Sequence, residues 1–327
     1  MKAIVYTKYG TTDVLKLKDV EKPTPKDNEV LIKVHAASVN SWDWDLLRGV
    51  PFMVRLEGLL KPKYKILGAD IAGRVEAVGK DVKQYLPGDE VFGDISGCSW
   101  GGFAEYVCAR ENALTLKSTS MTFEKAAAIP QAAVLALQGL RDKGQIQKGQ
   151  KVLINGAGGG VGTFAVQIAK SFGAEVIGVD STKKLDMLKS IGADQVIDYT
   201  QVDFTQNGQR YDLILDVAGY RSIFDYKRAL SPKGTYVMVG GSMSRIFQVM
   251  FLGPWISMTG NKKMGILMHK PNKNDQNFMQ ELFEAGKVAP VIDRCYPLSE
   301  VAEALRYFGE GHPKGKVVIS VEHKNKS

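Results

Sequence analysis

The chain of 327 residues is 44% hydrophobic and 24% charged, an ordinary composition for a soluble protein, and its length favours two domains over one. Lysine and arginine give it a formal net charge of +8, but they are scattered among 35 acidic residues instead of forming blocks. A solvated basic surface is therefore the better interpretation, and we expect no nucleic-acid binding.

The cysteines and the first residues indicate a reducing compartment. Three cysteines, Cys98, Cys108 and Cys295, are too few and too irregularly spaced for a disulfide framework or a four-thiolate zinc site. Met1 leads at once into the strand-like run Lys2–Tyr6, without a charged leader and an apolar signal core. We therefore expect a cytoplasmic protein.

One apolar stretch, Phe247–Met258, needs a separate explanation. It contains Gly253 and Pro254 and is well short of the roughly 20 residues that a membrane-spanning helix needs. We expect no membrane span here, but a lid, a pocket wall or an interface segment.

The first third of the chain consists of short β-rich runs separated by glycine and proline turns. These runs are Glu29–His35, Gly73–Val78, Asp89–Phe92 and Ala104–Ala109. The pattern, which extends from Met1 to about Lys117, predicts a compact, barrel-like β domain.

After Met121 helices and strands alternate, as in a parallel sheet flanked by helices. The predicted helices are Phe123–Arg141, Val161–Phe172, Lys183–Ile191 and Tyr220–Leu230. The predicted strands are Lys151–Asn155, Glu175–Val179, Gln195–Asp198, Leu213–Val217 and Thr235–Val239. This region therefore has the organisation of an α/β domain.

The C-terminal segment has no glycine-rich turn of its own, and we expect it to return to the first domain. Its predicted elements are a helix Asp275–Ala285, an extended run Val291–Tyr296, a helix Ser299–Tyr307 and a strand Lys316–Glu322. The sequence thus predicts one domain of residues 1–120 and 270–327 and another of residues 121–269. A cleft between two domains is the default ligand site.

A glycine cluster stands between the predicted strand Lys151–Asn155 and the helix after it. Glycine lets backbone amides approach a pyrophosphate closely, and a helix N-terminus adds partial positive charge. The next strand ends at Asp180, about eighteen residues past the last glycine, where dinucleotide-binding units carry an acidic residue. The candidate cofactor ligands of this turn are Gly158, Gly159, Gly160, Val161 and Gly162.

The tip that follows this second strand carries conflicting signals about the cofactor. Asp180 would accept hydrogen bonds from the ribose hydroxyls of NAD, whereas Ser181, Thr182 and Lys184 would hold the additional phosphate of NADP. If Asp180 points inward it cancels much of the lysine attraction, and if it turns to solvent it hardly matters. Alternatively the lysines only begin a solvated helix, although lysine there opposes the helix dipole. We favour NADPH, with NADH as the alternative.

Four motifs follow one another along nearly the whole chain: Ala37–Asp43, Gly156–Gly162, Gly192–Tyr199 and Gly315–Ile319. In this order they resemble the zinc-independent quinone oxidoreductase branch of the medium-chain dehydrogenase/reductase superfamily. The resemblance implies a GroES-like irregular β-barrel domain plus a Rossmann domain with a doubly wound parallel sheet. It also implies a nicotinamide in the interdomain cleft and, because dimers are common in this branch, a homodimer.

The same resemblance implies that zinc is absent. Zinc-dependent relatives carry a catalytic cysteine, a Gly-His-Glu sequence and a further cysteine, where this chain has Asn40, Gly68-Ala69-Asp70 and Gln131. These residues cannot rebuild a thiolate and imidazole site. The lobe that holds structural zinc in those relatives has only Cys98 and Cys108 nearby here.

The resemblance adds further cofactor ligands, most of them at strand ends, where ligands of such sheets bind. Tyr199 would lie near the adenosine phosphate, and two glycine-containing pairs would line the cofactor channel. We also expect Lys316, on the C-terminal strand, to reach the cofactor. These residues are Tyr199, Ala218, Gly219, Gly240, Gly241 and Lys316.

Without a Lewis acid the substrate must already be electrophilic, such as a quinone, an enone or an alkenal. The nicotinamide supplies the hydride, and the protein supplies orientation and electrostatics. We expect Asn40, which also lies next to the cofactor by its motif position, and Tyr64 to donate hydrogen bonds to the oxygen that gains negative charge. The alternatives are a turn residue for Asn40 and a surface aromatic for Tyr64.

Three functions from different classes stay open at this point. The first is an NADPH-dependent reductase of quinones or activated alkenes, which we favour. The second is a zinc-free alcohol dehydrogenase, and the third is a non-catalytic NAD(P)H-binding protein.

Overall fold

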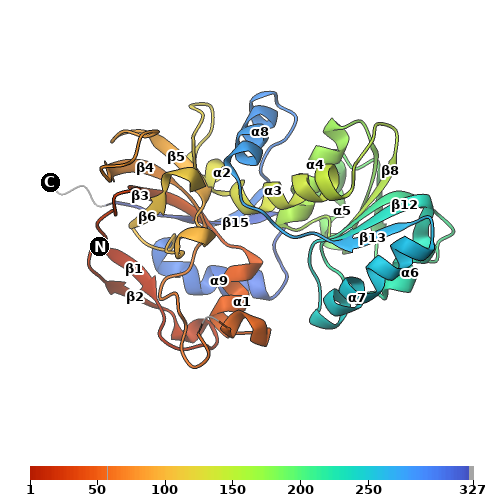
Figure 1. The fold of residues 1–327 in the computed structure, drawn as a ribbon, viewed down its shortest axis with the longest axis horizontal. Coiled ribbons are helices and arrows are strands. Elements are labelled where there is room, and N and C mark those ends of the chain that lie inside the picture. Colours follow the sequence, from red (N-terminus) through yellow and green to blue (C-terminus); the bar gives the residue numbers. More distant parts are fainter. Residues whose placement is uncertain (57, 324–327) are drawn as a thin grey trace. The chain divides into compact units, whose positions relative to one another are not determined.

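The computed structural model describes residues 1–56 and 58–323, which form two compact units. Unit 1 contains Met1–Ala132, Pro271–Glu281 and the chain from Ile292 onward. Unit 2 contains Ala133–Lys270 and Leu282–Val291. Figure 1 shows the elements of each unit in the colours of the sequence.

Unit 1 is built on a mixed sheet of seven strands in the order β14-β15-β3-β4-β5-β7, with β6 also pairing with β3. Strand β15 runs antiparallel to β3, so the end of the chain lies beside an early strand. The bounds are β3 (Glu29–Ser38), β4 (Asp70–Val78), β5 (Glu90–Asp94), β6 (Tyr106–Arg110), β7 (Leu114–Leu116), β14 (Ile292–Pro297) and β15 (Lys316–Ser320).

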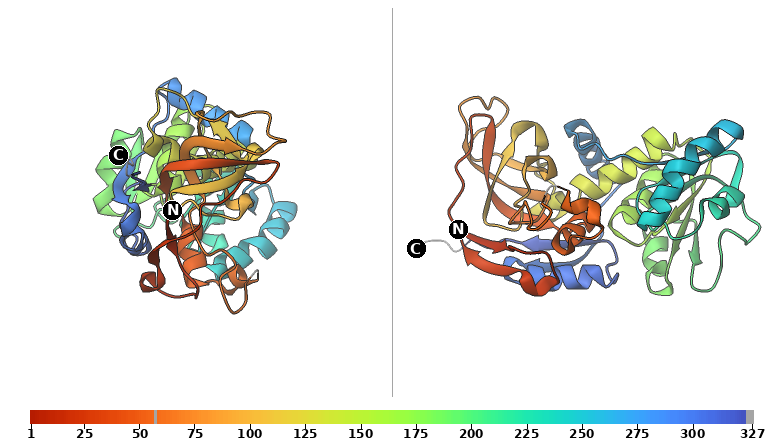
Figure 2. Two further views of the ribbon diagram at one scale, coloured as in Figure 1. Left: turned by 90° about the vertical axis from the view of Figure 1, so that its left-hand side faces the viewer. Right: turned by 60° about the horizontal axis from the view of Figure 1, so that its bottom comes forward.

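A second, two-stranded sheet and several helices complete unit 1. The sheet pairs β1 (Lys2–Val5) with β2 (Lys16–Asp19), and helix α9 (Val301–Gly309) lies close to it in Figure 1 and in the right-hand view of Figure 2. Helices α1 (Ser41–Arg48) and α2 (Phe123–Ala127) belong to the same unit.

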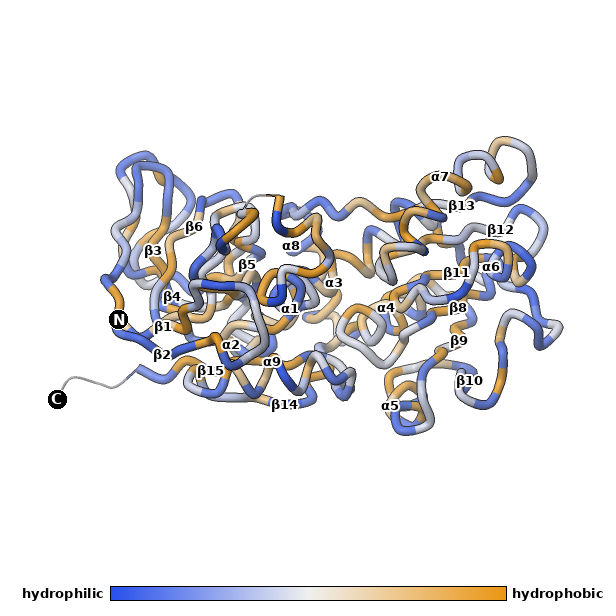
Figure 3. Tube along the Cα trace, turned by 90° about the horizontal axis from the view of Figure 1, so that it is seen from below, coloured by the Kyte–Doolittle hydropathy of each residue, from blue (hydrophilic) through white to orange (hydrophobic). Residues whose placement is uncertain are grey.

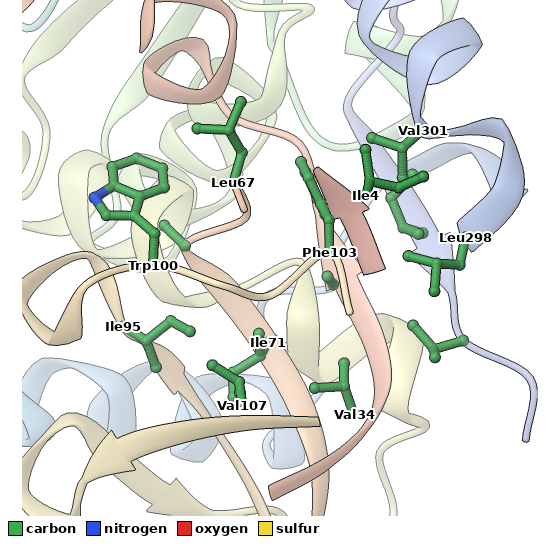
Figure 4. Packing of buried hydrophobic residues seen from close by; sticks show 14 of the residues in the cluster. Ile4, Val34, Leu67, Ile71, Ile95, Trp100, Phe103, Val107, Leu298 and Val301 are labelled. Atoms are coloured by element: carbon green, nitrogen blue, oxygen red, sulfur yellow. The ribbon is translucent and has the colours of Figure 1, made fainter. Parts of the chain in front are cut away.

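The core of unit 1 joins residues from both ends of the chain. Figure 4 shows Ile4 of β1 beside Val301 and Leu298, and Phe103 near Val34 of β3. All of these side chains are buried. Because burial of a large apolar side chain contributes about 1.5–3 kcal/mol, this packing holds the C-terminal segment against the N-terminal strands.

Unit 2 contains a parallel sheet of six strands in the order β10-β9-β8-β11-β12-β13. Strands β9 and β10 lie on one side of β8, and β11, β12 and β13 on the other, so the strand order reverses between β8 and β11. Ligands of such sheets bind at the carboxyl ends of the strands at this switch point. The bounds are β8 (Lys151–Asn155), β9 (Glu175–Asp180), β10 (Gln195–Asp198), β11 (Tyr211–Asp216), β12 (Leu230–Met238) and β13 (Lys263–Ile266).

The helices of unit 2 bury apolar faces, and α4 is drawn mainly in orange in the hydropathy colouring of Figure 3. They are α4 (Gly160–Ser171), α5 (Leu185–Ser190), α6 (Ile223–Ala229) and α7 (Met243–Thr259). Two further helices cross the boundary between the units along the chain, α3 (Pro130–Leu137) and α8 (Lys273–Glu284).

The elements predicted from periodicity are confirmed for most of unit 2, with two strands matched to the residue. The predicted helix Phe123–Arg141 is wrong as a single element: α2 ends at Ala127, and α3 begins at Pro130 and continues into a π-helical turn over Gln138–Lys143. Proline has no backbone N–H to continue the helix before it but suits the first position of a new one.

The apolar stretch Phe247–Met258 lies within helix α7, which the sequence did not predict. Val249 and Ile256 are buried, whereas Phe251 and Trp255 on the other face are exposed. With apolar residues on both faces, the stretch has no helical periodicity to detect. Within the part of the chain that the structure describes, no helix is long and apolar enough to cross a membrane.

Candidate functional site

The glycine turn connects β8 to α4 at the carboxyl edge of the parallel sheet. A Cβ atom on Gly162 would lie 2.2 Å from the carbonyl oxygen of Gly156 and 2.5 Å from that of Ala157. Helix α4 can start this close to the end of β8 only because residue 162 has no side chain. Gly159 is the N-cap residue of α4 and Gly160 its first residue, so amides of the predicted turn lie at a helix N-terminus, a favourable place for a phosphate.

The carboxylate of Asp180, at the end of β9, points inward and holds this turn. Its Oδ2 accepts a 2.8 Å hydrogen bond from the backbone N–H of Gly158, and its Oδ1 accepts one from the N–H of Ser181. The ammonium of Lys184 lies 3.8 Å from Oδ1, with only 13% of its side chain exposed. Asp180 therefore points inward, the orientation in which we expected its carboxylate to offset the charge of the lysines.

Two other predicted tip residues contact the end of β10. The hydroxyl of Thr182 donates to Oδ2 of Asp198, and Thr200 donates to the other oxygen of that carboxylate. The backbone N–H of Tyr199 donates to the carbonyl of Asp180 at 3.2 Å. Tyr199 is 43% exposed, and its ring centroid lies 6.0 Å from that of Tyr220. These residues form one continuous edge beyond β9 and β10.

The glycine-containing pairs after β11 and β12 lie together at neighbouring strand ends, and their predicted role in lining the cofactor channel stays a prediction. Gly219 donates its N–H to the carbonyl of Gly240 at 2.9 Å, and Gly219 and Gly241 form a parallel bridge. Ala218 precedes them and accepts a hydrogen bond of 3.4 Å from Asn155.

A buried polar network that the sequence did not predict lies beneath these turns. The carboxyl of Asp216, the last residue of β11, accepts 2.7 Å hydrogen bonds from Nδ2 of Asn155 and from the hydroxyl of Tyr236. Burial raises the pKa of Asp216, while these two donors favour its charged form. The only sequence signal was a polar residue ending each of the apolar strands β8 and β11.

In unit 1, Asn40 caps helix α1, which was not among the predicted elements. Its backbone N–H donates to Oδ2 of Asp43 at 2.8 Å, and Oδ1 of Asp43 accepts a second hydrogen bond from the N–H of Gly68. Both carboxylate oxygens of Asp43 therefore hold backbone amides. The short charged helix was missed because Ser41–Arg48 has two tryptophans and two aspartates but little apolar periodicity.

The side chain of Asn40 belongs to a buried cluster that contains Lys316. The Lys316 ammonium donates to Oδ1 of Asn40 at 2.6 Å and to the carbonyl of Val39 at 3.2 Å. Nδ2 of Asn40 donates to Oδ2 of Asp70 at 2.9 Å. Only 2% of the Lys316 side chain is exposed, so its ammonium faces protein groups. Its predicted role as a direct cofactor ligand stays a prediction.

The charged groups of this cluster are buried, and burial and the neighbouring charges shift their pKa values in opposite directions. Burial lowers the pKa of Lys316, and the nearby carboxyls raise it again. Burial raises the pKa of Asp70, with the Lys316 charge acting in the opposite direction. Oδ1 of Asp70 is buried and has no hydrogen-bond partner.

Tyr64, the second predicted donor, packs half-buried against the core of unit 1. Its ring centroid lies 6.0 Å from that of Trp100, and the ammonium of Lys63 lies 5.3 Å from it. This placement accommodates the packing alternative, and the catalytic role of Tyr64 stays a prediction.

A zinc site was not expected at Asn40, Gly68-Ala69-Asp70 and Gln131. Of these, Asn40 and the backbone N–H of Gln131 both donate to Asp70. Among the described residues, no group of three or more histidine, cysteine, aspartate or glutamate side chains has an arrangement suited to a metal ion. The absence of zinc stays a prediction.

Two family models match the chain. The model for the alcohol dehydrogenase GroES-like domain matches residues 26–119, and a model described as zinc-binding dehydrogenase matches residues 191–319.

Relatives and solved structures match almost the whole chain. A 2-methylene-furan-3-one reductase of Solanum lycopersicum is 36% identical, over 98% of this chain and 79% of the relative. A chloroplastic NADPH-dependent alkenal/one oxidoreductase of Arabidopsis thaliana is 33% identical over the same shares, 98% and 79%. The solved quinone oxidoreductase of Coxiella burnetii has 32% identity and a TM-score of 0.88, covering 98% of this chain and 99% of its own.

The glycine turn yields a first prediction. Replacing Gly162 by alanine places a methyl group against two backbone carbonyls, so we expect the free energy of unfolding to fall by about 1–3 kcal/mol. Gly159→Ala is the matched control, because its Cβ would meet its nearest atom at 3.7 Å. Urea denaturation of both variants measures the difference. Equal loss of stability in the two would show that the close approach at Gly162 is not limiting.

Asp45, in the last turn of α1, yields a second prediction. Burial raises its pKa to about 6, with Arg48 acting in the opposite direction. In the unfolded chain the pKa of Asp45 is about 3.9. Between about pH 4 and about pH 6 the folded protein therefore keeps a proton on Asp45 that the unfolded chain has lost, and its stability falls as the pH rises through this range. Asp45→Asn should therefore be about 1 kcal/mol more stable than the wild type above pH 7, after allowance for partial exposure, and equal to it near pH 4.

Urea denaturation at the two pH values measures this difference. The exposed Asp81 supplies the control variant Asp81→Asn, for which we expect little change at either pH. A stability difference between Asp45→Asn and the wild type that is the same at both pH values would contradict the assignment.

Proposed function

The chain belongs to the medium-chain dehydrogenase/reductase superfamily, in its quinone oxidoreductase branch, and on this premise we propose that it reduces a quinone or an activated alkene with NADPH. The observation that carries the proposal is the glycine turn at the start of α4, whose close approach to β8 only glycine permits. It lies at the switch point of a parallel sheet, where such folds bind dinucleotides.

The residues present fit a nicotinamide dinucleotide. Amides of Gly160, Val161 and Gly162, in the first turn of α4, would hold the pyrophosphate, while the N–H of Gly158 holds Asp180. Tyr199 and the two glycine-containing pairs, 218–219 and 240–241, would line the remainder of the site at neighbouring strand ends. When bound, the dinucleotide supplies the hydride.

We propose NADPH over NADH on two grounds. Both oxygens of Asp180 already accept backbone hydrogen bonds, and its charge faces Lys184, so the carboxylate is less available to the ribose hydroxyls of NADH. Ser181, Thr182 and Lys184 offer hydroxyl and ammonium groups suited to a phosphate, although Asp180 offsets part of the Lys184 charge. The Arabidopsis relative is named as NADPH-dependent.

In the proposed reaction, Asn40 stabilises the substrate oxygen that becomes negative as hydride arrives. Its Nδ2 carries two hydrogens, and Asp70 accepts one of them, which leaves a second N–H for the substrate. The places of the zinc ligands in other branches hold Asn40, Ala69 and Gln131, which offer no thiolate or imidazole. An electrophilic quinone, enone or alkenal suits such a site, and the Solanum lycopersicum relative is named 2-methylene-furan-3-one reductase.

The proposal also includes a cytoplasmic homodimer without zinc. Metal analysis of the purified protein and sedimentation equilibrium test the zinc content and the subunit number. The chloroplastic name of the Arabidopsis relative makes cell fractionation the relevant test of location.

The experiment that tests the proposed function is a parallel titration with NADH and NADPH, followed by a panel of electrophiles. We expect tighter binding of NADPH and its oxidation by naphthoquinones or alkenals. Turnover of simple alcohols alone would indicate the zinc-free alcohol dehydrogenase instead. Binding without turnover would indicate a non-catalytic NAD(P)H-binding protein.

Lys184 supplies the prediction for cofactor choice. Lys184→Ala should raise the Kd of NADPH about tenfold, the equivalent of about 1.4 kcal/mol, and leave that of NADH nearly unchanged. Lys183→Ala is the control, because that side chain is exposed and Lys184 is the lysine that faces Asp180. Isothermal titration calorimetry measures the Kd of both cofactors for the wild type and for each variant. Equal weakening of both cofactors would refute the role of Lys184.

Asn40 supplies the prediction for catalysis. Asn40→Ala removes the proposed donor, so kcat should fall about 10- to 1,000-fold, as for other donors to a developing oxyanion. Stopped-flow oxidation of NADPH by a naphthoquinone measures kcat, and circular dichroism checks that the variant is folded. Unchanged kcat in a folded variant would remove Asn40 from the mechanism.

A further inference from the structure

The chemistry of its two neighbours fixes the orientation of the Asn40 carboxamide. An ammonium group can only donate, so the Asn40 atom 2.6 Å from Lys316 must be the oxygen Oδ1. A carboxylate accepts, so the atom 2.9 Å from Asp70 Oδ2 is the nitrogen Nδ2. The flipped amide would place its NH₂ against an ammonium and its oxygen against a carboxylate. Both contacts are unfavourable, so the flipped orientation is excluded.

We propose that Lys316, together with Asp70, is a positioning residue that acts on the reaction through Asn40. The inference rests on the proposed function, in which Asn40 donates to the substrate oxygen. It differs from the role that the sequence suggested for Lys316, which was direct contact with the cofactor.

The burial of Lys316 supports this role. Its side chain is 2% exposed, and its ammonium is surrounded by Val39 O, Asn40 Oδ1 and, at 3.8 Å, Asp70 Oδ2. Two hydrogens of the ammonium are donated to Val39 and Asn40, and Asp70 lies at ion-pair distance. The Lys316 ammonium therefore faces protein groups, and we infer that its influence on the reaction passes through the groups that it holds.

The charge of Lys316 also strengthens Asn40 as a donor. A hydrogen bond from an ammonium to the amide oxygen draws electron density from the amide nitrogen, and hydrogen bonds in a chain reinforce one another in a medium of low dielectric. The second N–H of Nδ2 then meets a developing negative charge with a positive charge behind it. Such preorganised dipoles cost no rearrangement during the reaction.

Carboxyl groups from three elements face the ammonium and keep it in place. They are Asp70 on β4, Asp43 on α1 and Asp94 at the end of β5. Asp70 is itself held by the hydroxyl of Ser38 at 3.3 Å and by the backbone N–H of Gln131 at 3.3 Å. The lysine is thus fixed by the sheet, and Asn40 is fixed by the lysine.

A double-mutant cycle between Lys316 and Asn40 tests the proposal. Lys316→Met keeps the length of the side chain and removes its charge, and we expect kcat for a naphthoquinone to fall about tenfold with little change in the Kd of NADPH. In the Asn40→Ala background the same substitution should change kcat less than twofold, because the group through which Lys316 acts is already gone. Lys316→Arg, which keeps the charge and the donors, should restore most of kcat.

The matched control is Lys117→Met, which removes another buried lysine of unit 1. The Lys117 side chain is 4% exposed and pairs with Glu90 at 2.9 Å, away from the Asn40 cluster. We expect it to lower stability without lowering kcat. If Lys316→Met does not fold, the pair Lys316→Met with Asp70→Asn replaces it, since the carboxylate that forms the ion pair with Lys316 is then neutral as well.

The outcomes separate this inference from the proposed function. If Asn40→Ala lowers kcat and Lys316→Met lowers it by an independent, multiplicative factor, the positioning role is wrong while the proposed function stands. A large rise in the Kd of NADPH on Lys316→Met would likewise overturn the positioning role in favour of direct cofactor contact. If Asn40→Ala leaves kcat unchanged, the mechanism proposed for Asn40 fails, and the positioning role fails with it.

Discussion

The burial of charged groups at the ends of strands is the constraint on which both units depend. Lys316 and Asp70 lie side by side with 2% and 0% of their side chains exposed, and an unpaired ion there would cost several kcal/mol. Each charge must therefore be met by protein donors or acceptors. Asn40 supplies one acceptor to Lys316 and one donor to Asp70, and these two hydrogen bonds fix its side chain. The pairing of the buried charges therefore also sets the geometry of the candidate site.

In unit 2, neutral donors form hydrogen bonds with the buried carboxyl group. Asp216, fully buried, accepts hydrogen bonds from Asn155 and Tyr236, which come from the strands on either side of it. Asp180 accepts the backbone N–H of Gly158 and so ties the glycine turn to the end of β9. The turn keeps its shape because a buried carboxylate on a neighbouring strand needs that amide.

The two units therefore contribute different chemistry to the proposed reaction. Unit 2 offers backbone amides and strand-end turns, which suit recognition of a dinucleotide by shape and partial charge. Unit 1 offers a polarised carboxamide in a cluster from which water is excluded, which suits stabilisation of a charge that appears only during hydride transfer. The dehydrogenase fold is common to many activities, so the fold alone does not decide the substrate class.

What the sequence determined by itself was local. The strand, glycine turn and helix from Lys151 to Ser171 were predictable because neighbouring residues alone set strand period, turn freedom and helix start. Helix α7 was not, because apolar residues on both faces give no period. The tertiary structure alone decided that Asp180 turns inward and that Lys316 is buried against Asn40. Those contacts join residues 22 and 276 positions apart, and no local pattern records which distant groups will share a space without water.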